Sequence, residues 1–265
     1  MPNPSQIREW NATAYHRLSG PQVSWGKKVL ARVQLRGNET LLDAGCGTGR
    51  LTADLLEALP YGKVIGVDLS QNMLRTASEH LSGQFGTRVQ FVAADLQYLP
   101  FQQIFDGIFS TAAFHWVPDH ERLFRSLHRS LRPGGWLQAQ CGGGPNLERL
   151  RKRTDRLMAG PKYAGFFAGF HEPWVYNDAA TAADLLRKAG FAKVETSLEP
   201  ALTVLEDRAK YCEFVRAVIL RHHLELIPDA GLQQEFVAAL AEQAADDDPP
   251  YSLDYWRLNL SGAVQ

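Results

Sequence analysis

Three aspartates and a cluster of glycines are the residues of this sequence whose types and spacing could do chemistry. Asp43, Asp68 and Asp95 each follow a short apolar run, and glycine occupies alternate positions in the stretch Gly45–Gly49. Glycine lets a chain turn sharply and lie against a ligand because no Cβ intervenes. The spacing GxGxG followed by Arg50 differs from the GxGxxG of pyrophosphate-binding turns, and no Gly-Lys-Ser/Thr sequence follows it. The pattern therefore predicts a ligand-binding turn that is not a phosphate cradle.

The three acids can be assigned to parts of one ligand. Asp68 is placed to accept hydrogen bonds from both hydroxyls of a ribose, as an acid about 20 residues beyond a glycine turn does in dinucleotide-binding proteins. Asp95 can accept from the exocyclic amine of adenine, and Asp43 can organise the turn around a cationic, methionine-like tail. A single acid would more simply cap a helix. Three in this order favour a ligand with a ribose, an amino-bearing base and a positive charge.

Strands alternating with helices must position these residues. The apolar pattern predicts strands at 40–42, 63–68, 88–93, 105–110 and 136–140, and helices at 50–59, from Ser70 onward and at 119–131. This alternation indicates βαβ units, a parallel sheet and, with right-handed crossovers, a doubly wound topology. Because the carboxyl ends of parallel strands share one edge, we expect the three acids to lie side by side there.

The flanking segments are expected to be mainly helical. Helices are predicted at 10–18, 23–33, 147–158 and 178–190 and through most of 207–244, with a loose tail at 1–9, an aromatic loop at 163–176, and strands at 193–198 and 255–260. We expect one domain spanning 1–265. In it, residues 1–36, 142–177 and 207–250 would form a helical cap over the active site.

Composition bounds the class of partner. The 265 residues carry a formal net charge of -1, so no overall basic field would attract nucleic acid. No secretory signal or bilayer-length apolar run is evident, and the three cysteines lie too far apart for a zinc or disulfide framework. His222 and His223 stand beside each other, so on a helix they point apart, and no metal site is expected. We expect a cytoplasmic monomer or homodimer that acts on a small molecule, with no nucleic-acid or membrane partner.

Five stretches in order resemble the successive motifs of class I S-adenosylmethionine-dependent methyltransferases. They are LLDAGCGTG, VIGVDLS, VQFVAADL, FDGIFSTAAFHWV and LRPGGWL, and they cover roughly residues 38–140. The resemblance implies a Rossmann-like α/β fold with a mostly parallel seven-stranded sheet, helices on both faces and an antiparallel last strand. It also implies S-adenosylmethionine as the cofactor. Within the family, residues 115–120 most resemble the trans-aconitate methyltransferase group and related carboxylate O-methyltransferases.

The resemblance also implies a set of cofactor contacts. Around the methionine part it places Gly45, Cys46, Gly47 and Gly49, and around the ribose and adenine it places Asp68, Leu69, Met73, Asp95 and Leu96. Ser110 and Thr111 would lie close to the sulfonium. Tyr15 or His16 would close over the methionine carboxylate.

Methyl transfer requires a nucleophile held in line with an activated carbon and shielded from water. A carboxylate needs no general base, whereas a neutral hydroxyl or amine can need one. His115 is the best candidate base because it follows the fourth strand at the cofactor edge, and packing against Trp116 is the equal alternative. A small, partly apolar acid is the preferred acceptor. A hydroxyl or amine acceptor, a non-catalytic adenosylmethionine-binding protein and a nicotinamide-dependent oxidoreductase, which Arg50 disfavours, remain alternatives.

Overall fold

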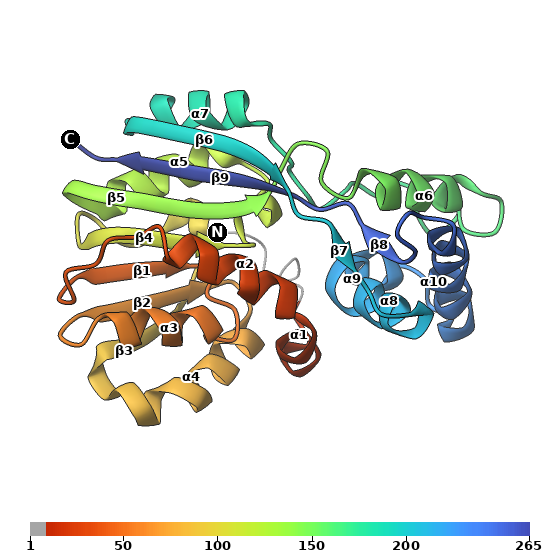
Figure 1. Ribbon diagram of the computed structural model, residues 1–265, viewed down its shortest axis with the longest axis horizontal. Helices are drawn as coiled ribbons and strands as arrows, with labels where there is room; N and C mark the ends of the chain where they lie inside the picture. The colour runs from red at the N-terminus through yellow and green to blue at the C-terminus, as the bar shows by residue number, and fades with distance from the viewer. Residues whose placement is uncertain (1–8) are drawn as a thin grey trace. The chain divides into compact units, whose positions relative to one another are not determined.

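The structure is a computed structural model that describes residues 9–265 (Figure 1). Apart from Glu9, the tail expected at residues 1–9 lies outside the described residues. The chain divides into two compact units. The first contains the chain up to Gly144 together with 174–199 and 257–265, and the second contains 145–173 and 200–256. The expectation of one domain with a helical cap over the active site stays a prediction.

A seven-stranded sheet in the order β3-β2-β1-β4-β5-β9-β6 organises the first unit. Its strands are β1 (Thr40–Ala44), β2 (Lys63–Asp68), β3 (Val89–Ala93), β4 (Phe105–Thr111), β5 (Leu131–Gly142), β6 (Ala192–Pro200) and β9 (Trp256–Ala263). Neighbours from β3 through β5 pair in parallel, and β9 pairs with β5 in antiparallel register. The strand order reverses between β1 and β4, which is where ligands bind in doubly wound sheets. The predicted sheet class is thus confirmed.

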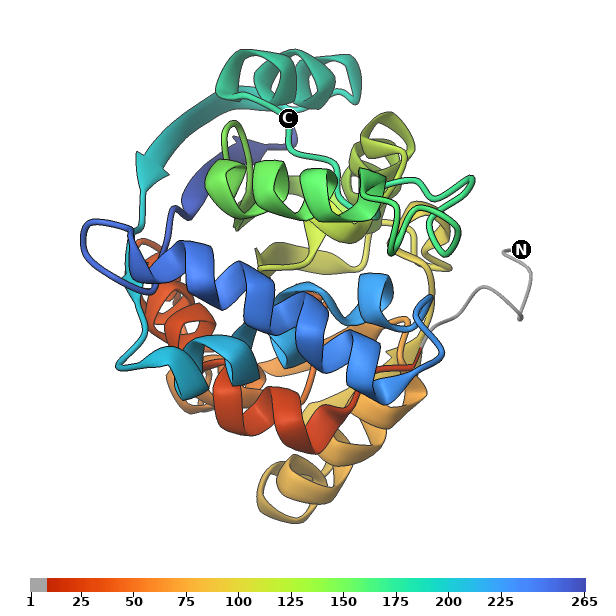
Figure 2. The same ribbon diagram turned by 90° about the vertical axis from the view of Figure 1, so that its right-hand side faces the viewer.

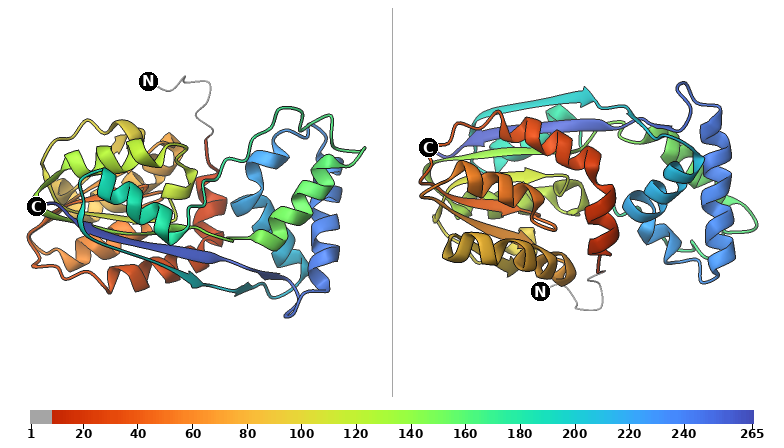
Figure 3. Two further views of the ribbon diagram at one scale, coloured as in Figure 1. Left: turned by 90° about the horizontal axis from the view of Figure 1, so that it is seen from above. Right: turned by 60° about the horizontal axis from the view of Figure 1, so that its bottom comes forward.

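Helices cover both faces of this sheet (Figure 3). Neighbouring residues of a strand point to opposite faces, so Leu41 packs with Leu55 and Phe85, while Leu42 packs with Phe124 and Leu186. The first face is covered by α2 (Gly20–Leu30), α3 (Arg50–Ala58) and α4 (Gln71–Phe85), and the second by α5 (His120–Ser130) and α7 (Ala179–Lys188). Two apolar clusters, one on each face of the sheet, therefore fix the position of the strands that carry the acids.

Local signals explain where several elements begin. The Ser70 hydroxyl accepts from the Met73 backbone N–H, which caps α4 as predicted. The break expected at 19–21 is narrower, because α1 (Ala12–Leu18) is followed by α2 already at Gly20. Pro21 fits the first turn of α2, where its missing N–H has no helical partner to lose. Strand β5 begins at Leu131 rather than at Trp136, and its pairing with β4 is irregular there.

The second unit is mainly helical (Figure 2). It contains α6 (Glu148–Ala159), α8 (Arg208–Phe214), a π-helical turn (Val215–Ile219), α9 (Arg221–Leu224), α10 (Ala230–Ala245) and a short pair of strands, β7 (Thr203–Val204) and β8 (Ser252–Leu253). Phe236 of α10 is fully buried, and the Tyr163 ring meets it edge-on with centroids 5.0 Å apart. The sequence predicted the helices but neither the π-helical turn nor β7 and β8.

Short helical turns complete the structure: η2 (Gly86–Arg88), η3 (Leu96–Tyr98) and η4 (Phe114–Trp116). The last two follow β3 and β4 and begin at the sheet edge where the site is expected. Over residues 9–265, none of the helices combines the length and the apolar character needed to cross a bilayer.

Candidate active site

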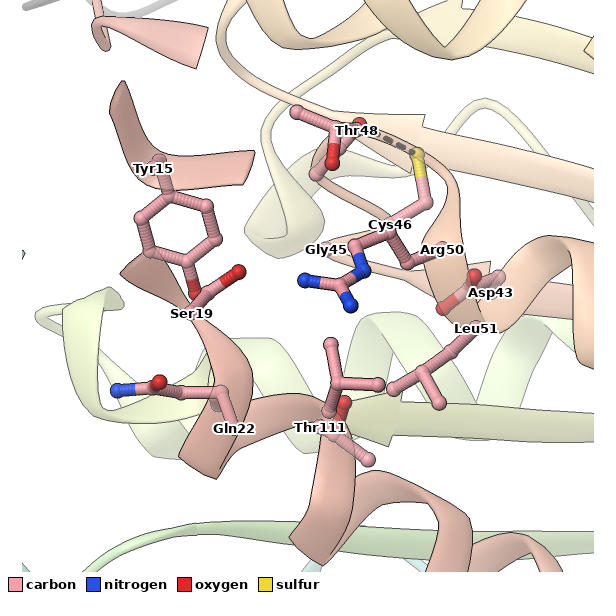
Figure 4. A pocket seen from close by; sticks show the side chains of 13 residues that line it. Tyr15, Ser19, Gln22, Asp43, Gly45, Cys46, Thr48, Arg50, Leu51 and Thr111 are labelled. Atoms are coloured by element: carbon pink, nitrogen blue, oxygen red, sulfur yellow. Dashed lines mark hydrogen bonds between the residues drawn. The ribbon is translucent and has the colours of Figure 1, made fainter. Parts of the chain in front are cut away.

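A cavity lies at the glycine turn, where α1, α2 and the end of β4 meet it (Figure 4). Its empty space is about 440 Å³, part of it open to solvent. The predicted residues that line it are Tyr15, Asp43, Gly45, Cys46, Gly47 and Thr111. The lining residues that the sequence did not assign to the site are Ser19, Gln22, Val23, Thr48, Arg50, Leu51 and Ala112.

Asp43 forms an acidic wall of this cavity. Its side chain is buried, and the Thr52 hydroxyl donates to Oδ2 over 2.6 Å. Burial raises the pKa of Asp43 to about 7; the Thr52 hydrogen bond lowers it and the nearby Asp68 charge raises it further. A carboxyl group held near its point of ionisation will lose its proton when a cation binds beside it.

Asp68 is tied to the glycine turn. Its Oδ2 accepts from the Gly47 N–H over 3.0 Å and its Oδ1 from the Ser70 N–H over 2.9 Å. Burial raises the pKa of this carboxyl group, and the two backbone hydrogen bonds act against that rise. A carboxylate has about four acceptor positions, so its backbone contacts leave room for hydrogen bonds from a ribose. Beside it, Leu69 is 41% exposed, whereas Met73 is buried.

Asp95 follows β3 at the same sheet edge, but its carboxylate already has a partner. It accepts from the Gln97 backbone N–H over 2.9 Å, and the Gln97 side-chain amide donates to both of its oxygens over 3.1 and 3.0 Å. The Gln97 amide thus stands where an adenine amine would donate, and the adenine would have to share or displace it. Leu96 is buried at the start of η3. The adenine contacts of Asp95 and Leu96 stay predictions.

The glycines of the turn differ in what their hydrogens face. A Cβ on Gly47, whose φ is +54°, would meet nothing within 4 Å, so this residue opens onto the cavity. A Cβ on Gly49 would lie 3.0 Å from the Ala77 Cβ and 2.8 Å from the Leu81 side chain. Gly49 therefore allows α3 to pack closely against α4, and it is absent from the cavity wall. Between Gly45 and Gly47, burial raises the pKa of the Cys46 thiol well above its ordinary value.

Helix α1 is attached to the glycine turn through side chains. The His16 Nδ1 and the Thr48 hydroxyl lie 2.9 Å apart, and the Arg50 guanidinium donates to the His16 carbonyl over 3.0 Å. Burial, the Arg50 charge and His80 all lower the pKa of His16. The preceding residue, Tyr15, lines the cavity, and burial together with the Asp68 charge raises its pKa to about 12.

The end of β4 contains two of the predicted residues, Thr111 in the cavity wall and Ser110 in a contact between strands. Thr111 lines the cavity, and the backbone of Ala112 then turns with a φ of +56°. Ser110 is buried, and its hydroxyl donates to the Ala44 carbonyl over 2.6 Å. Ser110 therefore joins β4 to β1 at the point where the strand order reverses, and its expected contact with the sulfonium stays a prediction.

His115 lies in η4 as a buried, neutral ring. The Gly142 N–H donates to its Nδ1 over 3.3 Å, so the ring proton of the neutral form is on Nε2. Burial lowers the pKa of His115 well below its ordinary value, and the charges of Arg257 and His120 lower it further. Its ring packs 5.4 Å from Trp116 and 5.8 Å from Tyr176, as the packing alternative expects.

The two adjacent histidines of the second unit contact different carboxylates. The His222 Nδ1 lies 3.6 Å from Glu225, and the His223 Nε2 lies 3.2 Å from Glu172. Across the part of the chain that the structure describes, no three or more ligating side chains group as a metal site would require.

The residues at the sheet edge fit a cationic adenosyl compound. An acid lies deep in the cavity, a second acid is the last residue of β2 beside the exposed Leu69, and Gly47 leaves room for close approach. The sheet has the antiparallel strand β9 inserted between β5 and β6. This sheet order, with a site of this kind at its edge, is the architecture of the class I methyltransferases.

Comparisons with known proteins agree. A family model described as a methyltransferase domain matches residues 41–135. Trans-aconitate 2-methyltransferases of Azoarcus sp. and Methylobacterium nodulans are 33% and 32% identical to the chain, covering 91% and 92% of it and 90% and 92% of themselves. The structure of phosphoethanolamine N-methyltransferase 2 of Haemonchus contortus with S-adenosyl-L-methionine has a TM-score of 0.63 at 18% identity. It covers 96% of this chain, which spans 57% of that one. The chain belongs to the family of S-adenosylmethionine-dependent methyltransferases that includes the trans-aconitate 2-methyltransferases, and S-adenosylmethionine is its cofactor.

Proposed function

We propose that this enzyme transfers the methyl group of S-adenosylmethionine to a carboxylate oxygen of a small acid. The observation that carries the proposal is the similarity, over nine-tenths of both chains, to relatives named for methylating trans-aconitate. S-adenosylmethionine supplies a methyl group on a positively charged sulfur. The near-neutral charge of the chain supports a small-molecule acceptor over a nucleic acid. We further propose that the enzyme is a cytoplasmic monomer or homodimer.

The protonation states near the sheet edge support a nucleophile that is already ionised. The Nδ1 of His115 accepts from Gly142, and its low pKa makes the ring a weak base. Tyr15, with a pKa of about 12, holds its proton at neutral pH. A free carboxylic acid has a pKa of about 4, so its oxygen is a ready nucleophile without help. A hydroxyl or amine acceptor would find no strong base in these two residues.

A buried cation supports an anionic acceptor. Arg257 begins the part of β9 that belongs to the first unit, and its backbone stands in register with Gly142, which donates to His115. Its guanidinium carbon lies 4.6 Å from the centre of the Trp25 ring, and its Nε donates to Gln140. Its charge lowers the pKa of His115, so positive potential extends toward that ring. An acid would be favoured there over a neutral acceptor.

The predicted residues receive roles within this proposal. Asp68 binds the ribose, Leu69 contacts the adenine, and Asp43 faces the cationic end of the cofactor. Gly45, Cys46, Gly47 and Thr111 shape the wall beside the reacting groups. For His115 we propose a positioning role, in which Nε2–H donates to the acceptor, rather than that of a general base.

A transfer assay with labelled methyl groups tests the acceptor class. We expect label in a product that mild alkali hydrolyses, because methyl esters are labile to base whereas methyl ethers and methylamines are not. Alkali-stable products across small acids, phenols and amines would overturn the proposal. For His115, the His115→Ala variant should raise KM for the acid more than it lowers kcat, and kcat should stay flat from pH 6 to 9. A pH-dependent kcat that this substitution abolishes would restore the general-base role.

A further inference from the structure

Arg50 occupies a position that directs its side chain over the glycine turn. It is the first residue of α3, directly after the left-handed Gly49 that caps the helix. Side chains on a helix lean toward its N-terminus, so the first residue reaches beyond the helix end. Figure 4 shows its guanidinium inside the cavity, directed toward the side lined by Tyr15 and Ser19.

Helix stability does not explain a cation at this position. The N-terminus of a helix carries a partial positive charge, so acids stabilise the first turn and an arginine there is repelled. The first turn of α3 contains no acidic residue that would offset the charge. The Arg50 charge also lowers the pKa of His16, which shows that its field extends to α1. An anion bound in the cavity would offset the repulsion between the Arg50 charge and the N-terminus of α3.

The protein itself uses a small part of the hydrogen-bonding capacity of Arg50. One Nη donates to the His16 carbonyl over 3.0 Å, which fixes the side chain. Within residues 9–265, no carboxylate lies within ion-pair distance of the guanidinium. A guanidinium has five N–H donors in a fork that matches a carboxylate. The same cavity presents Asp43, whose pKa of about 7 suits a cationic partner.

We propose that Arg50 binds the α-carboxylate at the amino-acid end of S-adenosylmethionine, while Asp43 faces its ammonium group. An acid and a base in one cavity match a zwitterion, and the glycine turn between them leaves room for its chain. The expectation that Tyr15 or His16 holds this carboxylate is thereby revised: His16 positions Arg50 through its carbonyl. The proposal concerns the cofactor, so it stands or falls independently of which acceptor is methylated.

Calorimetric titration with two ligands tests the proposal without measuring turnover. S-adenosylhomocysteine carries the amino-acid end, and 5′-methylthioadenosine is the same thionucleoside without it. The substitution Arg50→Gln should weaken binding of S-adenosylhomocysteine by roughly 10- to 100-fold, as expected for loss of a charge-assisted carboxylate contact. Binding of 5′-methylthioadenosine should change less than about threefold. Arg125→Gln, on the exposed face of α5, is the matched control and should alter neither affinity.

Two results would overturn the proposal. Equal loss of affinity for both ligands would show that Arg50 acts only by holding α1 through His16, and unchanged affinity for both would exclude any contact. If Arg50→Gln does not fold, the same contact can be tested with the wild-type protein by removing the carboxylate from the ligand. Decarboxylated S-adenosylmethionine should then bind at least tenfold more weakly than S-adenosylmethionine, and equal affinities would contradict the assignment.

Discussion

Among single residues, Asp43 has the most informative environment. Its pKa is raised to about 7 by burial, so below that pH it must lose a proton before it can pair with the cationic cofactor. We expect the dissociation constant for S-adenosylhomocysteine to rise about tenfold for each pH unit below 7 and to level off above it. Calorimetry between pH 5 and 7.5 measures this, and Asp43→Asn should bind weakly with no such slope.

The same substitution has an opposite effect on stability. The folded-state pKa of Asp43 lies above its ordinary value of 3.8, so protonation favours the folded state. Its contribution is fully present below pH 3.8 and is lost as the pH rises through about 7. Asp43→Asn keeps an acceptor for Thr52 and should therefore raise the melting temperature at pH 8, by about 2–4 °C for each kcal/mol gained. A lower melting temperature at pH 8 would contradict the assigned environment.

Gly47 permits a test of close approach at the turn. A Cβ there meets no protein atom, so a substitution should harm ligand binding more than packing. Gly86 provides the matched control, because its φ of +55° and open surroundings resemble those of Gly47 but lie at the end of α4. Both Gly→Ala variants should lose about 1 kcal/mol or more of stability through backbone strain. Only Gly47→Ala should bind S-adenosylhomocysteine at least tenfold more weakly; equal affinities would place the ligand elsewhere.

At the scale of elements, the sequence predicted most of the features that depend on residues close together in the chain. The βαβ order, the caps at Ser70 and Asp178 and the end of α7 at Gly190 depend on neighbouring residues, and the structure has them. The attachment of α1 to the glycine turn depends on contacts between residues 32 and 34 positions apart, which no local pattern reveals. For the same reason the sequence marked Arg50 only as a departure from a motif.

Glu9 shows how such a long-range attachment works. Its carboxylate accepts from the Ser70 hydroxyl and from the backbone N–H groups of Gln71 and Asn72, so it caps α4 from the chain that precedes α1. Burial alone would raise the pKa of Glu9, but these hydrogen bonds together outweigh it and lower the pKa. This contribution to stability is therefore present above pH 4.5 and is lost as the pH falls through the lowered pKa.

We expect Glu9→Ala to speed amide hydrogen exchange at Gln71 and Asn72 and through α1, since both elements lose a shared anchor. Glu79→Ala, at an exposed position of α4, is the control and should leave these amides unchanged. Hydrogen exchange read by mass spectrometry measures both variants. Equal protection of α1 in Glu9→Ala and in the wild type would show that the aromatic contacts of Trp10 with Tyr15 and Trp116 suffice to hold it.

For the whole molecule, the division into two units follows from where the chain is interrupted. The second unit is assembled from 145–173, which begins three residues after the end of β5, and 200–256, which ends at the first residue of β9. The motifs of the first unit lie in one continuous stretch, so the sequence shows them in order. The second unit brings together segments separated by a helix and a strand, and its short pair β7 and β8 had no comparable signal.

If each unit has its own core, a cavity made in one should loosen that one first. Phe236 of the second unit and Phe124 of the first are both fully buried, so each Phe→Ala change should cost about 3–5 kcal/mol. We expect Phe236→Ala to speed exchange mainly in 145–173 and 200–256, and Phe124→Ala mainly in the sheet and in α5 and α7. Peptide-resolved hydrogen exchange distinguishes the two patterns. Because a single cooperative structure would pass the loss to every segment, uniform acceleration in both variants would mean that the two units unfold together.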